Sequence, residues 1–547
     1  MSRDTGAAKK RTSVAGASAS PWAPFRHRAY AVIWTATLIA NIGYWMYSAA
    51  SGWLMTSLDA HPLMVSLVQV AASLPMFLFA LPAGALADIV DRRQFLVGVE
   101  VGTTATATVL AALVSFGLVT PASLLFFVFL AGTGSALGAP AWQSVVPQLV
   151  PREYLPAAVA ADSVGINISR AIGPALGGVL IAVVGIATPF WANAIANLAT
   201  VTALLWWRPP PRTAASVPAE RFASAVRMGL RYSRNNLPLR ATLKRAAGFF
   251  VVASAYWALL PLVARLQIAG GAELYGLLLG AIGAGAIAGA IALSWIKAKV
   301  GPDRIVAFGT FGTALALLLF GLARGPATAV AASAIAGVAW ISVVATLNVS
   351  AQIALPDWVR ARGLAIYVTV FFGAMTIGSI VWGELAAHTG LPPTLYIAAA
   401  SAVLAVPLSS RWRLLTAAGL DLAPSMHWPP PVVAHEIEGD QGPVLITIAY
   451  QVLPQNRDAF LFAMETLSRE RKRDGAYAYG VFEDAAHPGR FVETFLVESW
   501  LEHLRQHQRV TNADRSQEEE ILRLTQGPPQ VTHLIAASHA TTSLKKP

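Results

Sequence analysis

The chain has no cysteine among its 547 residues, and only 13% of its residues are charged. The absence of cysteine excludes disulfides, thiolate metal sites and cysteine nucleophiles. No Gly-Lys pair occurs either, so the chain has no phosphate-binding loop of the kind that drives ATP-dependent transport. The scarcity of charge accompanies a mean hydropathy of +0.55, which is too apolar for a soluble protein of this length and indicates membrane spans.

The net charge is +11, and many arginines lie in short segments between apolar runs. A membrane topology explains that placement better than nucleic-acid binding does, and we expect no nucleic-acid partner. Residues 1–20 are polar, basic and rich in Ser, Ala and Gly, so we expect a disordered tail there. No cleavable signal peptide is apparent, because the first apolar run is long enough to span.

Twelve apolar runs have the length of about 20 residues that crosses a hydrocarbon core. Backbone polar groups must be satisfied internally in lipid, so each run is expected to be a helix. The runs lie near 30–56, 64–87, 94–117, 121–146, 157–184, 188–207, 245–268, 273–296, 304–323, 327–353, 363–388 and 391–409.

Lysine and arginine indicate the orientation. They are concentrated in the termini and the even-numbered connections, whereas the odd-numbered connections hold Arg265 and Arg324. Both termini are therefore expected to be cytoplasmic. The basic central loop, 208–244, divides the membrane part into six-helix bundles at 21–207 and 245–413.

The two bundles show weak self-similarity. The fourth run ends with a proline and a short polar turn at Pro151, and the tenth run ends in the same way at Pro356. Two matched six-helix repeats are typical of secondary transporters, with the substrate site at the interface between the repeats.

The segment Gly84-Ala-Leu-Ala-Asp88-Ile-Val-Asp91-Arg92-Arg93 separates the second and third runs. Gly84 permits close helix contact, Asp88 can cap a helix or pair with Arg, and the arginines mark a cytoplasmic face. An ordinary basic loop is the simpler interpretation. The spacing resembles the loop between helices 2 and 3 of major facilitator superfamily transporters, although Ile89 and Asp91 depart from that family's usual basic residue and glycine. The resemblance implies a conformational gate at Gly84, Asp88, Asp91, Arg92 and Arg93.

The fifth run carries Arg170 well inside the apolar stretch, one helical turn after Asn167. A charge at that depth usually faces a cavity or a partner, although an arginine near a helix end can also reach the headgroups. Glycines and a proline follow it, at Gly173, Pro174, Gly177 and Gly178. They permit close helix contact and bend the helix, and they resemble the fifth-helix motif of proton-driven exporters.

Glu100, in the third run, is a candidate proton carrier, because burial would raise the pKa of its carboxyl. The alternative is a residue near the cytoplasmic end that pairs with an arginine. Polar and aromatic residues at membrane depth could line an apolar cavity for an amphipathic solute, although each could equally join helices or sit at the membrane interface. These cavity candidates are Asn41, Trp45, Gln69, Gln143, Asn167, Trp257 and Asn348.

After the membrane part, 414–441 is a Pro-rich linker and 442–540 is expected to be a soluble domain. The domain is predicted to have the order β-α-β-β-α-β of a ferredoxin-like fold, with its second helix over Trp500–Leu524. It resembles antibiotic-biosynthesis-monooxygenase-type domains, which usually dimerise and can use haem or quinone chemistry. His503 and His507 share a helix face, but a solvated polar face explains them better than a metal pair. We expect no metal and no cofactor.

The combined features resemble the transmembrane secretion effector group of the major facilitator superfamily, which is related to enterobactin exporters. The tail segment Glu498-Ser-Trp500-Leu-Glu-His503-Leu-Arg505-Gln-His507 contributes to this resemblance. It implies an all-α polytopic membrane protein of twelve transmembrane helices in 6+6 repeats, with a C-terminal cytosolic α+β ferredoxin-like domain, in the bacterial inner membrane.

The implied function is proton-coupled efflux of a small amphipathic, siderophore-like or drug-like molecule by alternating access, without enzymatic activity. Two alternatives remain open. One is a membrane-tethered, monooxygenase-type enzyme with a catalytic C-terminal domain. The other is an uptake permease of the same superfamily.

Overall fold

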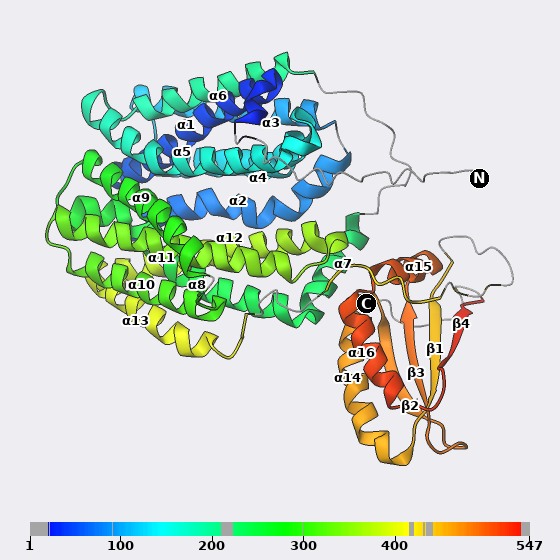
Figure 1. Cartoon of the computed structure of the whole chain (residues 1–547). Coiled ribbons are helices and arrows are strands. Elements are labelled where there is room, and N and C mark those ends of the chain that lie inside the picture. Colours follow the sequence, from blue (N-terminus) through cyan, green and yellow to red (C-terminus); the bar gives the residue numbers. More distant parts are fainter. Residues whose placement is uncertain are drawn as a thin grey trace, which may run out of the picture.

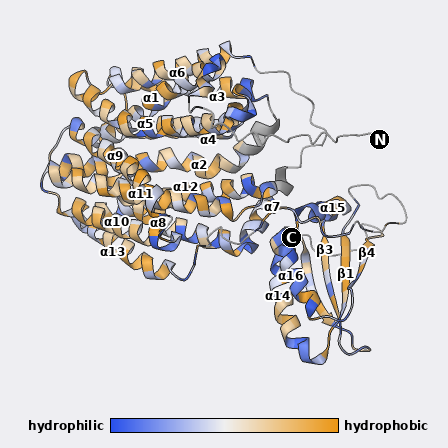
Figure 2. Ribbon diagram, viewed as in Figure 1, coloured by the Kyte–Doolittle hydropathy of each residue, from blue (hydrophilic) through white to orange (hydrophobic). Residues whose placement is uncertain are grey.

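The structure of the protein is a computed structural model that describes residues 20, 22–89, 91–208, 222–297, 299–414, 421–429, 431, 433 and 441–537. A long helical bundle and a smaller α+β domain lie side by side, with helix α7 between them (Figure 1). The bundle helices are predominantly apolar along their length, whereas α7 and the helices of the smaller domain are more hydrophilic (Figure 2).

Two sets of long helices form the bundle. The first half, drawn blue to cyan in Figure 1, contains α1 (Arg28–Leu58), α2 (Pro62–Ile89), α3 (Arg92–Ser115), α4 (Pro121–Leu149), α5 (Leu155–Val183) and α6 (Thr188–Trp206). The second half, drawn green to yellow, contains α8 (Leu237–Leu262), α9 (Ala272–Ile296), α10 (Pro302–Leu322), α11 (Pro326–Ile353), α12 (Asp357–Thr389) and α13 (Leu391–Ser409).

Among the described residues, 10 helices are long and apolar enough to cross a membrane. The chain is therefore a multi-pass membrane protein. Polar and aromatic residues lower the hydropathy of the other two long helices: they are Trp, Tyr, Asn and Ser in α1, and Trp, Asn and Thr in α6. Several of these polar groups are buried against neighbouring helices, and Asn193 of α6 is only 3% exposed.

The two halves repeat one packing pattern. In the first half α1 packs on α5 and α6, α3 packs on α4 and α6, and α2 packs on α4. In the second half α8 packs on α12 and α13, α10 packs on α11 and α13, and α9 packs on α11. Pro151 and Pro356 adopt extended conformations at equivalent junctions, before α5 and α12. The weak similarity in sequence thus corresponds to similar helix packing.

The halves meet along two helix pairs, α2 with α12 and α5 with α9. The α5–α9 contact depends on glycine, because a Cβ at Gly178 would lie 2.6 Å from the Ala272 carbonyl oxygen and 3.0 Å from the Gly276 Cα. This contact lies near the C-terminal end of α5 and the N-terminal end of α9, at the end of the bundle far from α7 (Figure 1).

Arg265 also joins the halves at that far end. It lies in the π-helical turn Val263–Gln267, and its Nη1 donates to Thr56 Oγ1 at 3.0 Å and to Ser57 Oγ at 2.5 Å. Its guanidinium lies 5.4 Å from the ring centroid of Trp53, which is on α1. The far end of the bundle is therefore closed by contacts between the halves.

The segment expected to be a central loop is partly helical. Helix α7 spans Phe222–Asn235, and α8 begins at Leu237 instead of near 245, with Asn236 as its side-chain cap. The hydropathy pattern placed the start too late because basic residues occupy the first turns of α8. One of them, Arg245, is only 5% exposed and pairs with Asp303 at 2.8 Å.

The smaller domain contains β1 (Val444–Gln451), α14 (Arg457–Arg473), β2 (Tyr477–Glu483), β3 (Arg490–Val497), α15 (Trp500–Arg509), α16 (Asn512–Arg523) and β4 (Gln530–Ile535). Its strands form an antiparallel sheet of order β2-β3-β1-β4. The predicted single helix over Trp500–Leu524 is wrong, because Thr511 and Asp514 form a capping box that starts a new helix.

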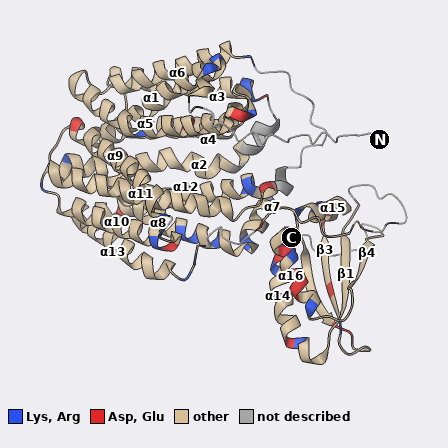
Figure 3. Ribbon diagram, in the orientation of Figure 1, with Lys and Arg blue, Asp and Glu red and all other residues tan. Residues whose placement is uncertain are grey.

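This domain, which we call the tail domain, packs on α7 and on the start of α12. Arg231 of α7 donates from Nη1 to the Gly475 carbonyl at 3.2 Å. Arg509 of α15 lies 4.7 Å from the ring centroid of Trp358, on α12, and its Nη1 contacts the Met228 sulfur at 3.6 Å. The tail domain thus contacts the second half of the bundle, at the end where charged residues gather (Figure 3).

Candidate functional site

A cavity of about 310 Å³ lies between the two halves of the bundle. Residues of α1, α2, α4, α5, α8, α9, α11 and α12 line it, so it is formed by helices of both halves. Its wall is rich in aromatic rings, which come from Tyr44, Trp45, Tyr47, Trp257, Tyr275, Trp340, Phe371 and Phe372. A mainly apolar cavity of this size is typical of a small-molecule site.

Arg170 places a positive charge in this cavity. Its guanidinium lies 5.2 Å from the ring centroid of Trp45, at cation–π distance. Among the residues that the structure describes, no carboxylate lies within ion-pair distance of Arg170, and no hydrogen bond engages its buried Nε. The cavity therefore combines an aromatic wall with a cation that lacks a carboxylate partner.

The other cavity candidates divide into two groups. Trp45, Gln69 and Trp257 line the cavity, together with Pro174. The remaining amides lie outside the lining, on other helix faces or nearer the α7 end, and they are Asn41, Gln143, Asn167 and Asn348. Asn167 instead donates to the Ser163 carbonyl at 2.8 Å, and the side chains of Asn348 and Gln352 bond to each other at 2.6 Å.

The glycines of α5 bring this helix against two neighbours. A Cβ at Gly173 would lie 2.6 Å from the Cβ of Trp45, and one at Gly177 would lie 3.2 Å from the Met46 Cα. These two glycines therefore pack on α1, whereas Gly178 packs on α9. Because Gly173 meets Trp45, the close approach of α5 to α1 also positions the ring on which Arg170 stacks.

Most of the predicted gate segment is helical, and only a short connection separates α2 from α3. Helix α2 continues through Gly84 and Asp88 to Ile89, and the Asp88 side chain lies outside the described residues. Asp91 caps α3 by accepting a hydrogen bond from the Gln94 amide at 2.9 Å, and Arg92 is the first residue of that helix.

Arg93 connects α3 to α6. Its Nε donates to the Leu204 carbonyl at 2.9 Å, and its Nη2 donates to the Leu205 carbonyl at 2.7 Å. A cation is favourable at the C-terminal end of a helix, where carbonyl groups lack partners. Arg93 therefore fixes the α7 end of α3 within the first half.

Glu100 lies on α3, away from the cavity lining. Its Oε1 accepts a hydrogen bond from Trp142 Nε1 of α4 at 3.1 Å. The sequence singled out this carboxyl but gave no sign of its partner. It also missed Arg265 and Trp53, whose contact joins segments more than 200 residues apart that no local pattern connects.

His503 and His507 of the tail domain were expected on a solvated polar face. This expectation is wrong for His503, which is only 2% exposed and whose Nε2 lies 3.3 Å from that of His507. In the part of the chain that the structure describes, no group of three His, Asp or Glu residues is arranged to hold a metal ion.

Comparison with known proteins gives consistent results. The sequence model of a family described as "Transmembrane secretion effector" matches residues 19–541. The staphyloferrin A transporter of Staphylococcus aureus is 24% identical over 52% of this chain and 71% of its own length. An enterobactin exporter, EntS of Citrobacter koseri, is 27% identical over 59% of this chain and 76% of its own length.

Solved structures show the same fold at low identity. The nucleoside transporter NupG superposes with a TM-score of 0.59 at 11% identity, and covers 70% of this chain and 99% of its own. A bacterial homologue of the lysosomal transporter Spinster, in an inward-facing conformation, gives a TM-score of 0.57 at 13% identity over 71% of this chain and 98% of its own. The relatives and structures named here are transporters, not enzymes.

Proposed function

The chain belongs to the transmembrane secretion effector family of the major facilitator superfamily, and from that premise we propose that it exports a small amphipathic anion. The observation that carries this proposal is Arg170, which stacks on Trp45 in the cavity between the halves and has no carboxylate partner among the described residues. A bound anion would supply the missing charge, and the aromatic wall would hold the apolar part of the solute.

Transport by alternating access requires the cavity to open to each side in turn. In this structure Arg265 and the Gly178–Gly276 contact close the far end of the bundle. Rocking of the halves about the cavity would break these contacts and close the α7 end. The predicted gate residues, Asp88 and Asp91 to Arg93, lie at that end and are proposed to hold the closed form.

We place the α7 end in the cytoplasm and the far end outside, in a bacterial inner membrane. Basic residues gather at the α7 end, as the positive-inside rule requires (Figure 3). In this topology α1 and α6 also span the membrane, which gives twelve crossings and cytoplasmic termini. The tail domain, whose strand order and helix placement fit a ferredoxin-like fold, is then cytosolic.

Coupling to protons is proposed because the chain has no nucleotide-binding loop. Glu100 is the candidate carrier, since its carboxyl accepts a hydrogen bond from Trp142 within the first half. Its distance from the cavity lining requires that protonation act through helix packing and not by direct competition with the solute.

Export is favoured over uptake by the relatives named as enterobactin exporters and by the glycines of α5. Siderophore-like or drug-like solutes are both consistent with the cavity. The tail domain also supports a homodimer, because its edge strands β2 and β4 carry exposed apolar side chains at Phe482, Val531 and Leu534.

Inside-out vesicles with an imposed proton gradient would test the proposal. The probes are 8-anilino-1-naphthalenesulfonate, an amphipathic anion, and N-phenyl-1-naphthylamine, which has the same rings without the sulfonate. Proton-driven accumulation of the anion in the vesicles, and weak transport of the neutral probe, would support anion export. Accumulation only in right-side-out vesicles would establish uptake. Equal transport of both probes would contradict the proposal that Arg170 selects an anionic solute.

Because the chain has no cysteine, single cysteines can report the topology without a background. An impermeant maleimide added to intact cells should label a cysteine at the exposed far-end position Arg324, but not one at the exposed position Ser516 of the tail domain. The reverse labelling pattern would overturn the proposed orientation.

A further inference from the structure

The tail domain encloses a cavity of about 610 Å³, larger than the 310 Å³ cavity of the bundle. Its walls come from the sheet, from α14, α15 and α16, and from residues 427–429 and 431. Ile446, Ile448 and Phe495 face it from the sheet, and Ile521 and Leu522 face it from α16. A volume of this size fits a ligand of several rings, and transport through the bundle does not use this cavity.

Three histidines form the polar side of the cavity. The ring of His503 lies 4.8 Å from that of His507 and 4.7 Å from that of His533, between ring centroids. Burial, together with the neighbouring histidines, lowers the pKa of His503 to about 3, and burial also lowers the pKa values of His507 and His533. The three imidazoles are therefore neutral at pH 7, so each has one N–H donor and one acceptor nitrogen.

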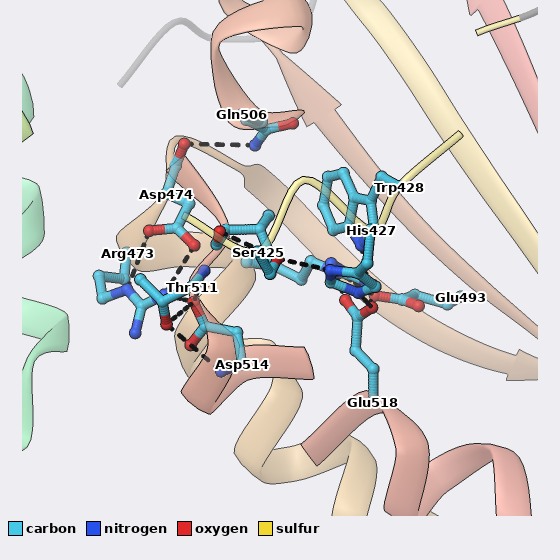
Figure 4. Close-up of polar contacts among 12 residues, drawn as sticks. Ser425, His427, Trp428, Arg473, Asp474, Glu493, Gln506, Thr511, Asp514 and Glu518 are labelled. Carbon is cyan, nitrogen blue, oxygen red and sulfur yellow. Dashed lines mark hydrogen bonds and ion pairs between the residues drawn. The ribbon is translucent and has the colours of Figure 1, made fainter. Parts of the chain in front are cut away.

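Charged groups that line the same cavity already have partners, and Figure 4 shows Glu518 beside His427 and Trp428. Arg471 donates to Glu493 Oε1 from Nε at 3.1 Å and to Glu518 Oε1 from Nη1 at 2.8 Å. The second oxygen of Glu518 is 2.7 Å from His427 Nε2 and accepts from Trp428 Nε1 at 2.9 Å. One guanidinium thus faces two carboxylates, so the described lining residues leave no unpaired arginine or lysine for an anion.

The same network keeps the carboxyl of Glu518 ionised. Burial alone would raise the pKa of Glu518, but Arg471, His427 and Trp428 lower it to about 2. A bound anion would lie close to this carboxylate and would be repelled. The Trp428 ring also lies over Arg471, at 4.8 Å from Cζ, and covers the cation from the side of the linker.

We propose that this cavity binds an uncharged, largely aromatic small molecule that carries hydroxyl or carbonyl groups. The apolar walls would hold its rings, and the neutral histidines would donate and accept hydrogen bonds with its polar groups. His533 is suited to this, because no hydrogen bond within the described part of the tail domain engages its ring nitrogens. The preference for a neutral ligand distinguishes this cavity from the one that contains Arg170.

The site also lies next to the membrane part. Helix α15 presents His503 and His507 to the cavity, while its last residue, Arg509, contacts Trp358 of α12 and Met228 of α7. A ligand against α15 would therefore lie about two helical turns from the contact with the transmembrane helix α12. For this reason binding should be measured in the full chain, where that contact is present.

Calorimetry on the full chain in lipid nanodiscs tests the proposal, with empty nanodiscs as the reference for partitioning into lipid. The probes are 4-phenylphenol, which is neutral, and biphenyl-4-carboxylate, which has the same two rings and a charge. We expect saturable binding of the phenol and at least about tenfold weaker binding of the carboxylate. Absence of saturable phenol binding, or equal affinity for the two probes, would overturn the proposal.

Variants locate the binding. Leu522→Trp places a larger side chain in the cavity, from a helix position that is 42% exposed. The indole fills part of the space for the ligand, so this variant should abolish phenol binding. Leu504→Trp, at a position of α15 that is 37% exposed and outside the lining, is the matched control and should leave binding intact. If both variants bind the phenol like the unaltered chain, the ligand is elsewhere and the proposal fails.

The histidines have their own test. His533→Leu keeps a side chain of similar size and should weaken phenol binding about three- to tenfold, as expected for the loss of one hydrogen bond. His487→Leu, in an exposed turn, should have no effect. Should His533→Leu bind the phenol with unchanged affinity, the histidines would not recognise the ligand, and the assignment of its chemistry would be wrong.

Discussion

At the scale of single residues, Arg170 makes the most specific demand on the solute. A guanidinium in an apolar bundle requires compensation, and in the described structure its contacts are with rings such as Trp45. We predict that Arg170→Gln raises the KM for an anionic solute at least about tenfold, because the charge interaction is lost.

Two substitutions control for this effect. Arg170→Lys keeps the charge but loses the planar stacking on Trp45. Its KM for the anionic solute should lie between that of Arg170→Gln and that of the unaltered chain. Arg240→Gln, at an exposed position of α8, should leave transport unchanged. Transport assays in proteoliposomes decide the matter. An Arg170→Gln chain with unaltered KM for the anion would mean that Arg170 has a purely structural role.

A second residue-scale prediction concerns Glu470 of α14, one of whose carboxyl oxygens is buried and lacks a hydrogen bond among the described residues. Burial raises its pKa from 4.5 to about 8, and Asp514 adds to the rise. Since the folded form holds the proton more tightly, the contribution of Glu470 to stability is complete below pH 4.5 and is lost as the pH rises through 8. Glu470→Gln should therefore stabilise the tail domain at pH 8, by roughly 1–4 kcal/mol, and much less at pH 5.

Hydrogen exchange of the α14 amides in the full chain would measure the effect, with variant and unaltered chain compared at the same pH. Glu465→Gln is the control, because Glu465 lies on the same helix in an exposed pair with Arg469. An exposed pair contributes little, so this change should stay within about 1 kcal/mol at both pH values. If Glu470→Gln protected α14 more at pH 5 than at pH 8, the sign of the pKa shift would be wrong.

At the scale of elements, the contact of α5 with α9 joins the halves through glycine. A methyl group at Gly178 would meet backbone atoms of α9, which cannot rotate away as a side chain can. We predict that Gly178→Ala forces the far ends of these helices apart and lowers the transport rate. Gly102→Ala is the control, since a Cβ at Gly102 of α3 would meet nothing within 4 Å.

Spin labels at the exposed loop positions His61 and Arg324 report this change, since they lie at the far ends of different halves. Gly178→Ala should shift the distance distribution between them to longer values, while Gly102→Ala should reproduce the unaltered distribution. A Gly178→Ala chain with the unaltered distribution and full transport would show that the glycine contact does not control separation of the halves.

The elements also show what sequence could and could not predict. Apolar length placed the long helices, because membrane-spanning segments must satisfy their own backbone. The sequence singled out Trp45 and Arg170 as separate candidates, but their stacking could not be predicted, because it depends on how α1 and α5 pack. Local patterns failed where basic residues occupy the first turns of a helix, as at Arg240 and Lys244 of α8, and where a capping box divides a helix, as at Thr511. They also gave no sign of Arg265 on Trp53, since that contact depends on how the two halves meet.

At the scale of the whole molecule, the tail domain is attached to one half of the bundle. It contacts α7, which directly precedes the second half, and Trp358 at the start of α12, which belongs to the second half. The Arg509 guanidinium that stacks on Trp358 also pairs with Glu502 at 2.5 Å, and this pair is buried. Glu502 thus holds the Arg509 guanidinium in place against Trp358, and we expect the docking contacts with α12 and α7 to persist when the halves rock.

We therefore predict that the tail domain moves with the second half during transport. A spin label at Ser516 of the tail domain should keep one distance to a label at Arg411, after α13, when an anionic solute or a proton gradient is added. Its distance to a label at Arg152, before α5, should change under the same conditions, because Arg152 belongs to the first half. Arg509→Ala should broaden both distributions by releasing the domain from Trp358. A constant distance to Arg152 combined with a changing distance to Arg411 would assign the tail domain to the other half and contradict the docking described above.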